Sequence, residues 1–120
     1  MNKKEKQQFI QDITKRAEQG EPEAQHKLGV LYSTKHTLPG DETDYNDVLK
    51  EDNEKAIFWW QKAAENERVC GWNEKAANIL SYSYERCEIV EKDKEKAKYW
   101  KKKARKLMFK SLCNHFLRKK

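Results

Sequence analysis

The sequence predicts an all-α protein, a short α-solenoid of antiparallel helix pairs with capping helices at both ends. Apolar residues recur at helical spacing almost throughout, and no five-residue stretch alternates as a strand does. A segment also occurs twice, as DNEKAIFWWQKA at 52–63 and as DKEKAKYWKKKA at 93–104. Repetition of this kind predicts stacked units that bury a shared core, and with them a binding surface rather than a catalytic pocket.

The first helix is expected over residues 3–19. Phe9, Ile13 and Ala17 lie one turn apart in it and form an apolar face. Gly20 is expected to end the helix, because glycine readily takes the left-handed conformation that follows helix C-termini. We expect this helix to be a cap or half a repeat, since one face of a terminal unit meets water.

The first full repeat is expected over residues 21–66. Pro22 suits the first turn of its first helix, where a missing amide costs little. Ala24, Leu28 and Tyr32 follow at i, i+4 and i+8 and predict the buried face of that helix.

The second helix of each repeat is expected to begin after an aspartate. Asp52 and Asp93 are typical N-caps, and Glu54 and Glu95 follow in the first turn, where the helix dipole favours negative charge. The same start signal is therefore used twice, forty-one residues apart.

The second repeat is expected over residues 72–106, where Ala76, Leu80 and Tyr84 reproduce the spacing seen in the first. This match has an offset of 52 rather than 41, because the loop over residues 33–51 carries an insertion. Inserted loops in repeats often serve binding, although a tolerated surface insertion explains the same length. Four acidic side chains of this loop are candidate partner-binding residues: Asp41, Glu42, Asp44 and Asp47.

Residues 107–120 are expected to form a basic C-terminal capping helix, or the end of one long last helix. Met108, Leu112 and Phe116 would supply its apolar face. Positive charge is concentrated here: residues 92–120 hold 13 Lys and Arg against 2 Asp and Glu, within a chain of net charge +6. Such a tail permits contact with phosphate or with an acidic protein, but a solvated helix face is the simpler interpretation.

The first repeat resembles a known family. Residues 20–25, GEPEAQ, precede Leu28-Gly29 and Tyr32, and KA, WW and KAAE follow at 55–56, 59–60 and 62–65. This pattern is similar to the Sel-one-like repeat, a helix-turn-helix unit of the tetratricopeptide-related α-solenoid class. The resemblance covers residues 13–106 and implies protein–protein contacts or an adaptor role. The second unit departs from the pattern at Ser81, where the family prefers glycine.

Catalysis finds little support in the sequence. His26, His36 and His115 are scattered, no metal-binding histidine spacing occurs, and no nucleophile or phosphate-loop motif is found. Cys70 and the other two cysteines have no C-x-x-C spacing, which favours free thiols in a reducing compartment. We therefore expect no catalytic residue, no cofactor and no metal.

The aromatic residues divide into an expected core and an expected surface. Trp59 and Trp100 occupy equivalent repeat positions and are expected in the core. Tyr82 lies two residues, about 200°, from Leu80 on its helix, so it is expected to face outward. The same rotation predicts an exposed stripe on the first helix of each pair, which is our candidate partner site: His26 and Val30, then Asn78 and Tyr82, with Trp60 and Trp72 added as further candidates.

The partner is expected to be another protein, and a nonspecific nucleic-acid-binding role for the basic tail is the alternative. The tail contains few arginines, whereas base reading favours Arg, Asn and Gln, so nucleic acid is the weaker interpretation. No apolar run approaches the roughly 20 residues needed to cross a bilayer. We expect a single cytoplasmic domain, monomeric, acting as a small inhibitor such as an immunity protein or as a scaffold.

Overall fold

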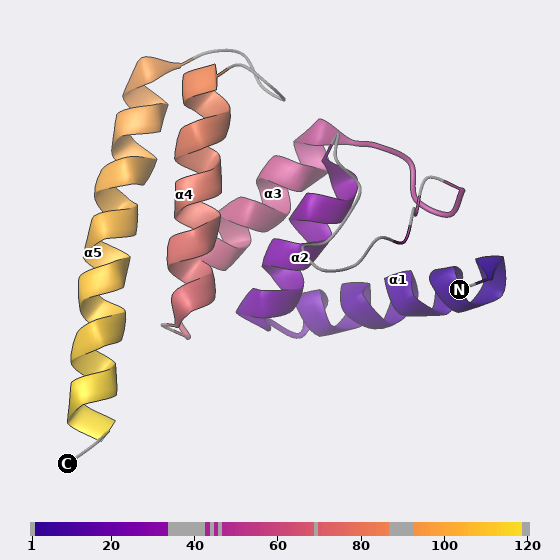
Figure 1. Ribbon diagram of the computed structural model, residues 1–120, viewed down its shortest axis with the longest axis horizontal. Helices are drawn as coiled ribbons and strands as arrows, with labels where there is room; N and C mark the ends of the chain where they lie inside the picture. The colour runs from indigo at the N-terminus through magenta and orange to yellow at the C-terminus, as the bar shows by residue number, and fades with distance from the viewer. Residues whose placement is uncertain are drawn as a thin grey trace.

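The structure, a computed structural model, describes residues 2–33, 43, 45, 47–68, 70–86 and 93–118, with backbone alone for 111–118. This part of the chain forms five helices and no strand (Figure 1), so the all-α prediction is confirmed. The helices are α1 (Lys3–Glu18), α2 (Pro22–Tyr32), α3 (Asn53–Ala64), α4 (Gly71–Arg86) and α5 (Lys94–Arg118).

Helices that follow one another in the chain also pack against one another. α2 pairs with α3 and α4 pairs with α5, while α1 lies across the N-terminal end of α2 (Figure 1). α4 contacts α2 as well as α3, so the second pair is stacked on the first. This is the stacked arrangement of helix pairs that the repeat predicted.

The ends of α1 follow from its sequence. Asn2 caps its start, because the Asn2 side chain accepts a hydrogen bond from the Glu5 amide at 2.9 Å. Gly20 follows its end with a φ of 91°, a left-handed conformation that glycine takes at no steric cost. Ile13 and Ala17 are buried, as their spacing predicted.

Both repeats start their second helix in the same way. Asp52 accepts a hydrogen bond from the Lys55 amide at 3.1 Å, and Asp93 accepts one from the Lys96 amide at 3.1 Å. The amides of the two aspartates donate to matching carbonyls, that of Tyr32 at 2.9 Å and that of Tyr84 at 3.1 Å. The two loops are therefore closed at equivalent points although their lengths differ.

The described part of the inserted loop is anchored on α1. Tyr45 is fully buried, and its ring stacks on Phe9 with 5.4 Å between centroids. Nearby, the Lys6 ammonium lies 3.2 Å from the Asp47 carboxylate. The sequence analysis did not predict this anchor. The other acidic candidates, Asp41, Glu42 and Asp44, lie outside the described residues.

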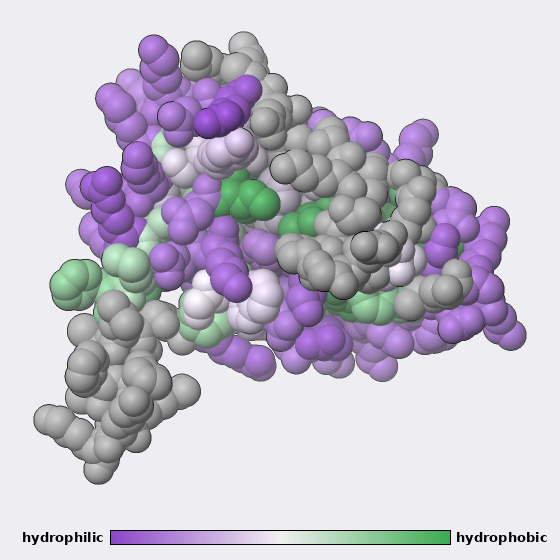
Figure 2. All heavy atoms as spheres, in the orientation of Figure 1, coloured by the Kyte–Doolittle hydropathy of each residue, from purple (hydrophilic) through white to green (hydrophobic). Residues whose placement is uncertain are grey.

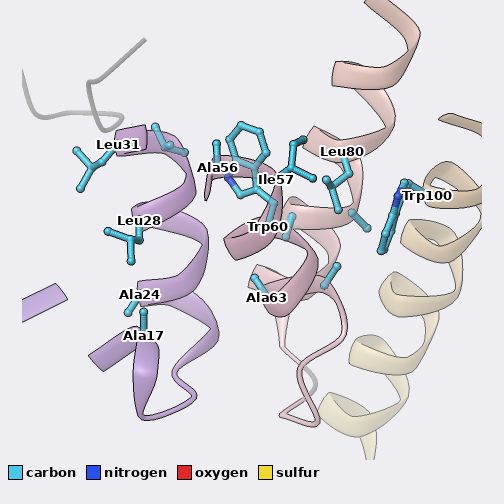
Figure 3. Close-up of a cluster of buried hydrophobic side chains, with 14 of the residues drawn as sticks. Ala17, Ala24, Leu28, Leu31, Ala56, Ile57, Trp60, Ala63, Leu80 and Trp100 are labelled. Atoms are coloured by element: carbon cyan, nitrogen blue, oxygen red, sulfur yellow. The ribbon is translucent and has the colours of Figure 1, made fainter. Parts of the chain in front are cut away.

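Trp60 of α3 is buried in the core and packs against α2 (Figure 3). It is 2% exposed, and its indole nitrogen donates to the His26 carbonyl at 3.2 Å. Gly29 makes room for the ring, since a Cβ at this position would lie 2.4 Å from indole atoms. A side chain at position 29 is therefore excluded while Trp60 keeps this place.

The structure corrects the predicted roles of the two neighbouring tryptophans. Trp60, a candidate for partner binding, is in the core, whereas Trp59 is only partly buried at the edge of the core. Trp100, the counterpart of Trp59, is 4% exposed as predicted. The reason is that the Trp60 ring turns toward α2, where it lies against Gly29 and donates to the His26 carbonyl.

A chain of polar side chains ties the helix ends together. Gln25 donates to the Ala17 carbonyl at 3.0 Å, and Asn66 donates to Gln25 at 3.0 Å and to the Gly20 carbonyl at 2.8 Å. Asn73 is fully buried: its side chain donates to the Ala63 and Asn66 carbonyls at 2.7 and 3.3 Å and accepts from the Cys70 amide at 2.6 Å. These bonds fix the α1–α2 turn against the α3–α4 turn.

The C-terminal segment continues α5 and does not form a separate helix. Leu107 is partly buried against the core, whereas Met108 is 42% exposed and Phe109 67% exposed. The expectation that Met108 lies on the packed face of a cap is therefore wrong, because the buried side of this helix passes through Ala104 and Leu107. The side chains of Leu112 and Phe116 lie outside the described set.

Candidate protein-binding surface

The outward side of α4 carries two of the residues predicted to face a partner. Asn78 and Tyr82 are both exposed, and 43% of Tyr82 is accessible. The Arg86 guanidinium lies 4.7 Å from the centroid of the Tyr82 ring, one helical turn further on. Tyr82 is therefore held in place by a cation–π contact while part of its ring stays open.

His26 and Val30 do not share this exposure. The prediction that they lie on an exposed stripe of α2 was wrong. Each is only 9% exposed. They are the counterparts of Asn78 and Tyr82, fifty-two residues earlier, and they are buried because α4 packs over the first helix pair. No described helix packs over the second pair in the same way, so the stripe is open only on α4.

The second helices of the two repeats, α3 and α5, carry different side chains on the surface that faces the next helix pair. Ile57 and Trp60 of α3 are buried, whereas their counterparts on α5, forty-one residues later, are the exposed Lys98 and Lys101. Where repeat one presents apolar side chains to the next helix pair, repeat two therefore presents positive charge.

A hollow of about 490 Å³ lies between α4 and α5 on this side. Ser81 and Ala97 lie closest to the helix contact, where the Ser81 hydroxyl donates to the Ala97 carbonyl at 2.7 Å. We name the surface around the hollow the end face; it comprises Asn78, Tyr82 and Arg86 of α4 with Lys94, Lys98 and Lys101 of α5.

Positive charge dominates the end face. The hollow is lined by Arg86 and three lysines of α5, with Glu85 as its only acidic residue. Within the described ranges, no Lys or Arg of α5 forms an ion pair. Figure 2 shows hydrophilic side chains covering the upper half of α5, the left edge in Figure 1. This surface has charge to offer an anionic partner.

Trp72 forms a second feature, at the border of α2 and α4. Its half-buried ring lies 5.3 Å from the His26 ring, between two ammonium groups: that of Lys75 at 4.3 Å and that of Lys27 at 5.7 Å. Lys27 also pairs with Glu23 at 2.8 Å, which lowers the pKa of that carboxyl. The Trp72 ring thus contacts side chains of α2 as well as of its own helix, whereas the Tyr82 ring contacts Arg86 of its own helix.

His26 is buried with an unpaired nitrogen, since its Nδ1 has no hydrogen-bond partner in the described structure. Burial lowers the pKa of His26 to about 4, and the charges of Lys75 and then Lys27 act in the same direction. An unfolded histidine titrates near 6.5. The unfolded chain therefore takes up this proton first as the pH falls, and stability present above pH 6.5 is lost progressively down to about pH 4.

We expect the free energy of unfolding to fall by about 2 kcal/mol between pH 7 and pH 5 through His26 alone. Urea denaturation at both pH values measures this change. In His26→Leu, which has no titrating group at this position, that part of the pH dependence should disappear. An unchanged slope in the variant would show that another group titrates.

The structure gives a mixed outcome for the other candidates. Trp60 is in the core, and Asp47 is exposed but paired with Lys6, so neither joins the end face. The lysines of the hollow were missed as specific site residues, although a comparison of each repeat position with its counterpart would have singled out Lys98 and Lys101.

No group of three or more His, Cys, Asp or Glu placed to hold a metal occurs among the described residues. None of the helices in that part of the chain is long and apolar enough to cross a membrane.

Two stacked helix pairs, a shared core and an end face that no described helix covers define the class of protein as a short α-solenoid with a surface suited to binding. A scan against protein-family models matches the Sel1 repeat over residues 22–67 and 74–107, which is more than half of the chain. The chain belongs to the Sel1-repeat family. Searches of the curated proteins and of the solved structures returned no match. Sel1 repeats generally mediate protein–protein interaction, and the family is typically non-enzymatic.

Proposed function

We propose that this chain is a non-enzymatic module that binds another protein on its end face. The observation that carries the proposal is the difference between the repeats. In repeat one this surface packs against α4 of repeat two, and His26 and Val30 are buried there. In repeat two the corresponding surface is exposed, and 43% of Tyr82 is accessible there. Tyrosine and arginine are enriched at interaction hot spots.

A more specific form of the proposal is a small monomeric inhibitor in the cytoplasm, such as an immunity protein that neutralises a toxin domain. A short repeat stack from a typically non-enzymatic family suits an inhibitor that acts by occupying a surface. The free thiol of Cys70 suits a reducing compartment. A scaffold or adaptor is consistent with the same observations. The activity of the bound partner separates the two roles, because an inhibitor abolishes it and an adaptor leaves it intact.

Tyr82→Ala is expected to weaken partner binding by more than about 1 kcal/mol, roughly a fivefold rise in Kd. The partner would be identified by capture on the wild-type chain from source cells, then purified and titrated by calorimetry. Phe58→Ala is the matched control, because Phe58 is also an exposed aromatic, 48% accessible, but belongs to α3 and lies outside the end face. Weaker binding in the control with unchanged binding in Tyr82→Ala would move the site to another face.

A further inference from the structure

We infer that the end face takes an acidic α-helix of the partner protein, docked where the first helix of a further repeat would lie. The inference rests on the proposed function and adds the shape and charge of the partner. The shape follows from the repeat geometry, and the charge follows from the side chains that differ between the repeats.

The first step is the shape of the site. α4 packs against both α2 and α3, and its Trp72 ring lies 5.3 Å from the His26 ring of α2. The groove between α4 and α5 is formed by the equivalent helices of repeat two and is lined by Ser81 and Lys101, the counterparts of Gly29 and Trp60. Ridges of side chains on one helix fit the grooves between others. Because the first groove holds a helix, the second has the dimensions to hold one.

The second step is the charge of the site. A helix that occupied this groove would lie over Lys98 and Lys101, the counterparts of the buried Ile57 and Trp60 in the first repeat. Covering ammonium groups without counter-charges is strongly unfavourable, because a buried unpaired charge loses its hydration. An apolar helix is therefore disfavoured on this groove, and a helix with carboxylates is favoured.

The third step is the spacing of the charges. Lys94, Lys98 and Lys101 stand at i, i+4 and i+7 on α5, which places them along one side of the helix over about 10 Å. A partner helix that carries Asp or Glu at the same spacing can set one carboxylate against each ammonium group. Arg86, at the other edge of the hollow, can reach the same carboxylates from α4.

α5 itself offers a matched control for the effect of net charge. Lys106 and Lys110 line a different hollow on α5, shared with Tyr99 and Leu107 and with none of the end-face residues. Lys98→Gln with Lys101→Gln, and Lys106→Gln with Lys110→Gln, remove the same charge from one helix. Only the first pair alters the end face.

The experiment measures binding of a labelled alanine-based helical peptide of about 20 residues with three glutamates at i, i+4 and i+7. A second peptide has glutamine at these positions, and a single-stranded oligonucleotide of about 20 nucleotides is the third probe. Fluorescence anisotropy in about 150 mM salt gives each affinity for the wild-type chain and for the two double variants. Circular dichroism confirms that the variants remain helical.

We expect the glutamate peptide to bind at least about tenfold more tightly than the glutamine peptide. We also expect Lys98→Gln with Lys101→Gln to remove about tenfold of that affinity, and the control pair to change it by less than about twofold. Equal losses in the two double variants, or no binding of the glutamate peptide, would overturn the inference. So would tighter binding of the oligonucleotide that depends on Lys98 and Lys101.

These results are independent of the test of the proposed function. If Tyr82→Ala weakens binding of the captured partner but the glutamate peptide does not bind, the end face binds protein and the acidic helix is the wrong occupant. If neither effect is seen, both proposals fail.

Discussion

Trp60→Ala is expected to lower the free energy of unfolding by roughly 3–5 kcal/mol, the usual cost of deleting a large buried ring. Trp60 is 2% exposed, lies between α2 and its neighbours, and donates its indole proton to the His26 carbonyl. The substitution opens a cavity beside Gly29, which has no side chain of its own to fill it. Chemical denaturation followed by circular dichroism at 222 nm measures the loss.

Trp59→Ala provides the comparison, because it removes the same side chain from the neighbouring position. Trp59 is only partly buried, so we expect a loss of about 1–2 kcal/mol. If Trp59→Ala proved the more destabilising change, the orientation of α3 described above would be incorrect.

Asn73→Ala is expected to destabilise the fold by about 3 kcal/mol, since buried groups that lose a hydrogen-bond partner keep the cost of their desolvation. The Asn73 side chain bonds to the carbonyls of Ala63 and Asn66 and to the amide of Cys70, so its removal affects α3, the turn and α4 together. Thermal unfolding should therefore show a lower midpoint with the transition still in one step.

Asn78→Ala removes the same amide from an exposed position on the same helix. We expect it to change stability by no more than about 0.5 kcal/mol, as is usual for surface substitutions. A similar loss in both variants would mean that helix propensity, and not the buried hydrogen bonds, explains the effect of Asn73→Ala.

Local signals predicted most of the helical framework. Asp52 and Asp93 cap their helices as expected, and Gly20 takes the left-handed turn. The spacing of Ala76, Leu80 and Tyr84 gave the buried face of α4. Such features depend on residues within one or two helical turns, so they can be read along the chain.

Features that depend on the neighbouring repeat could not be predicted in this way. His26 and Val30 lie opposite the α3 contact on their own helix, but α4 covers them. Trp59 and Trp60 are adjacent in sequence and equally apolar, and only the packing of the Trp60 ring on Gly29 and His26 of α2 shows which one is buried. The burial of Tyr45 was not predicted, because Tyr45 belongs to the inserted loop and its partner Phe9 belongs to α1, far earlier in the chain.

The contact between Gly29 and Trp60 bears on how this stack could grow or shrink. Its counterpart in repeat two is Ser81 with Lys101, so the two repeats are not interchangeable. A duplicated copy of repeat one would offer a successor the apolar surface that α4 now covers. A duplicated copy of repeat two would offer it lysines. Exchanging the residues at two positions in each repeat is thus the first step in engineering a longer stack.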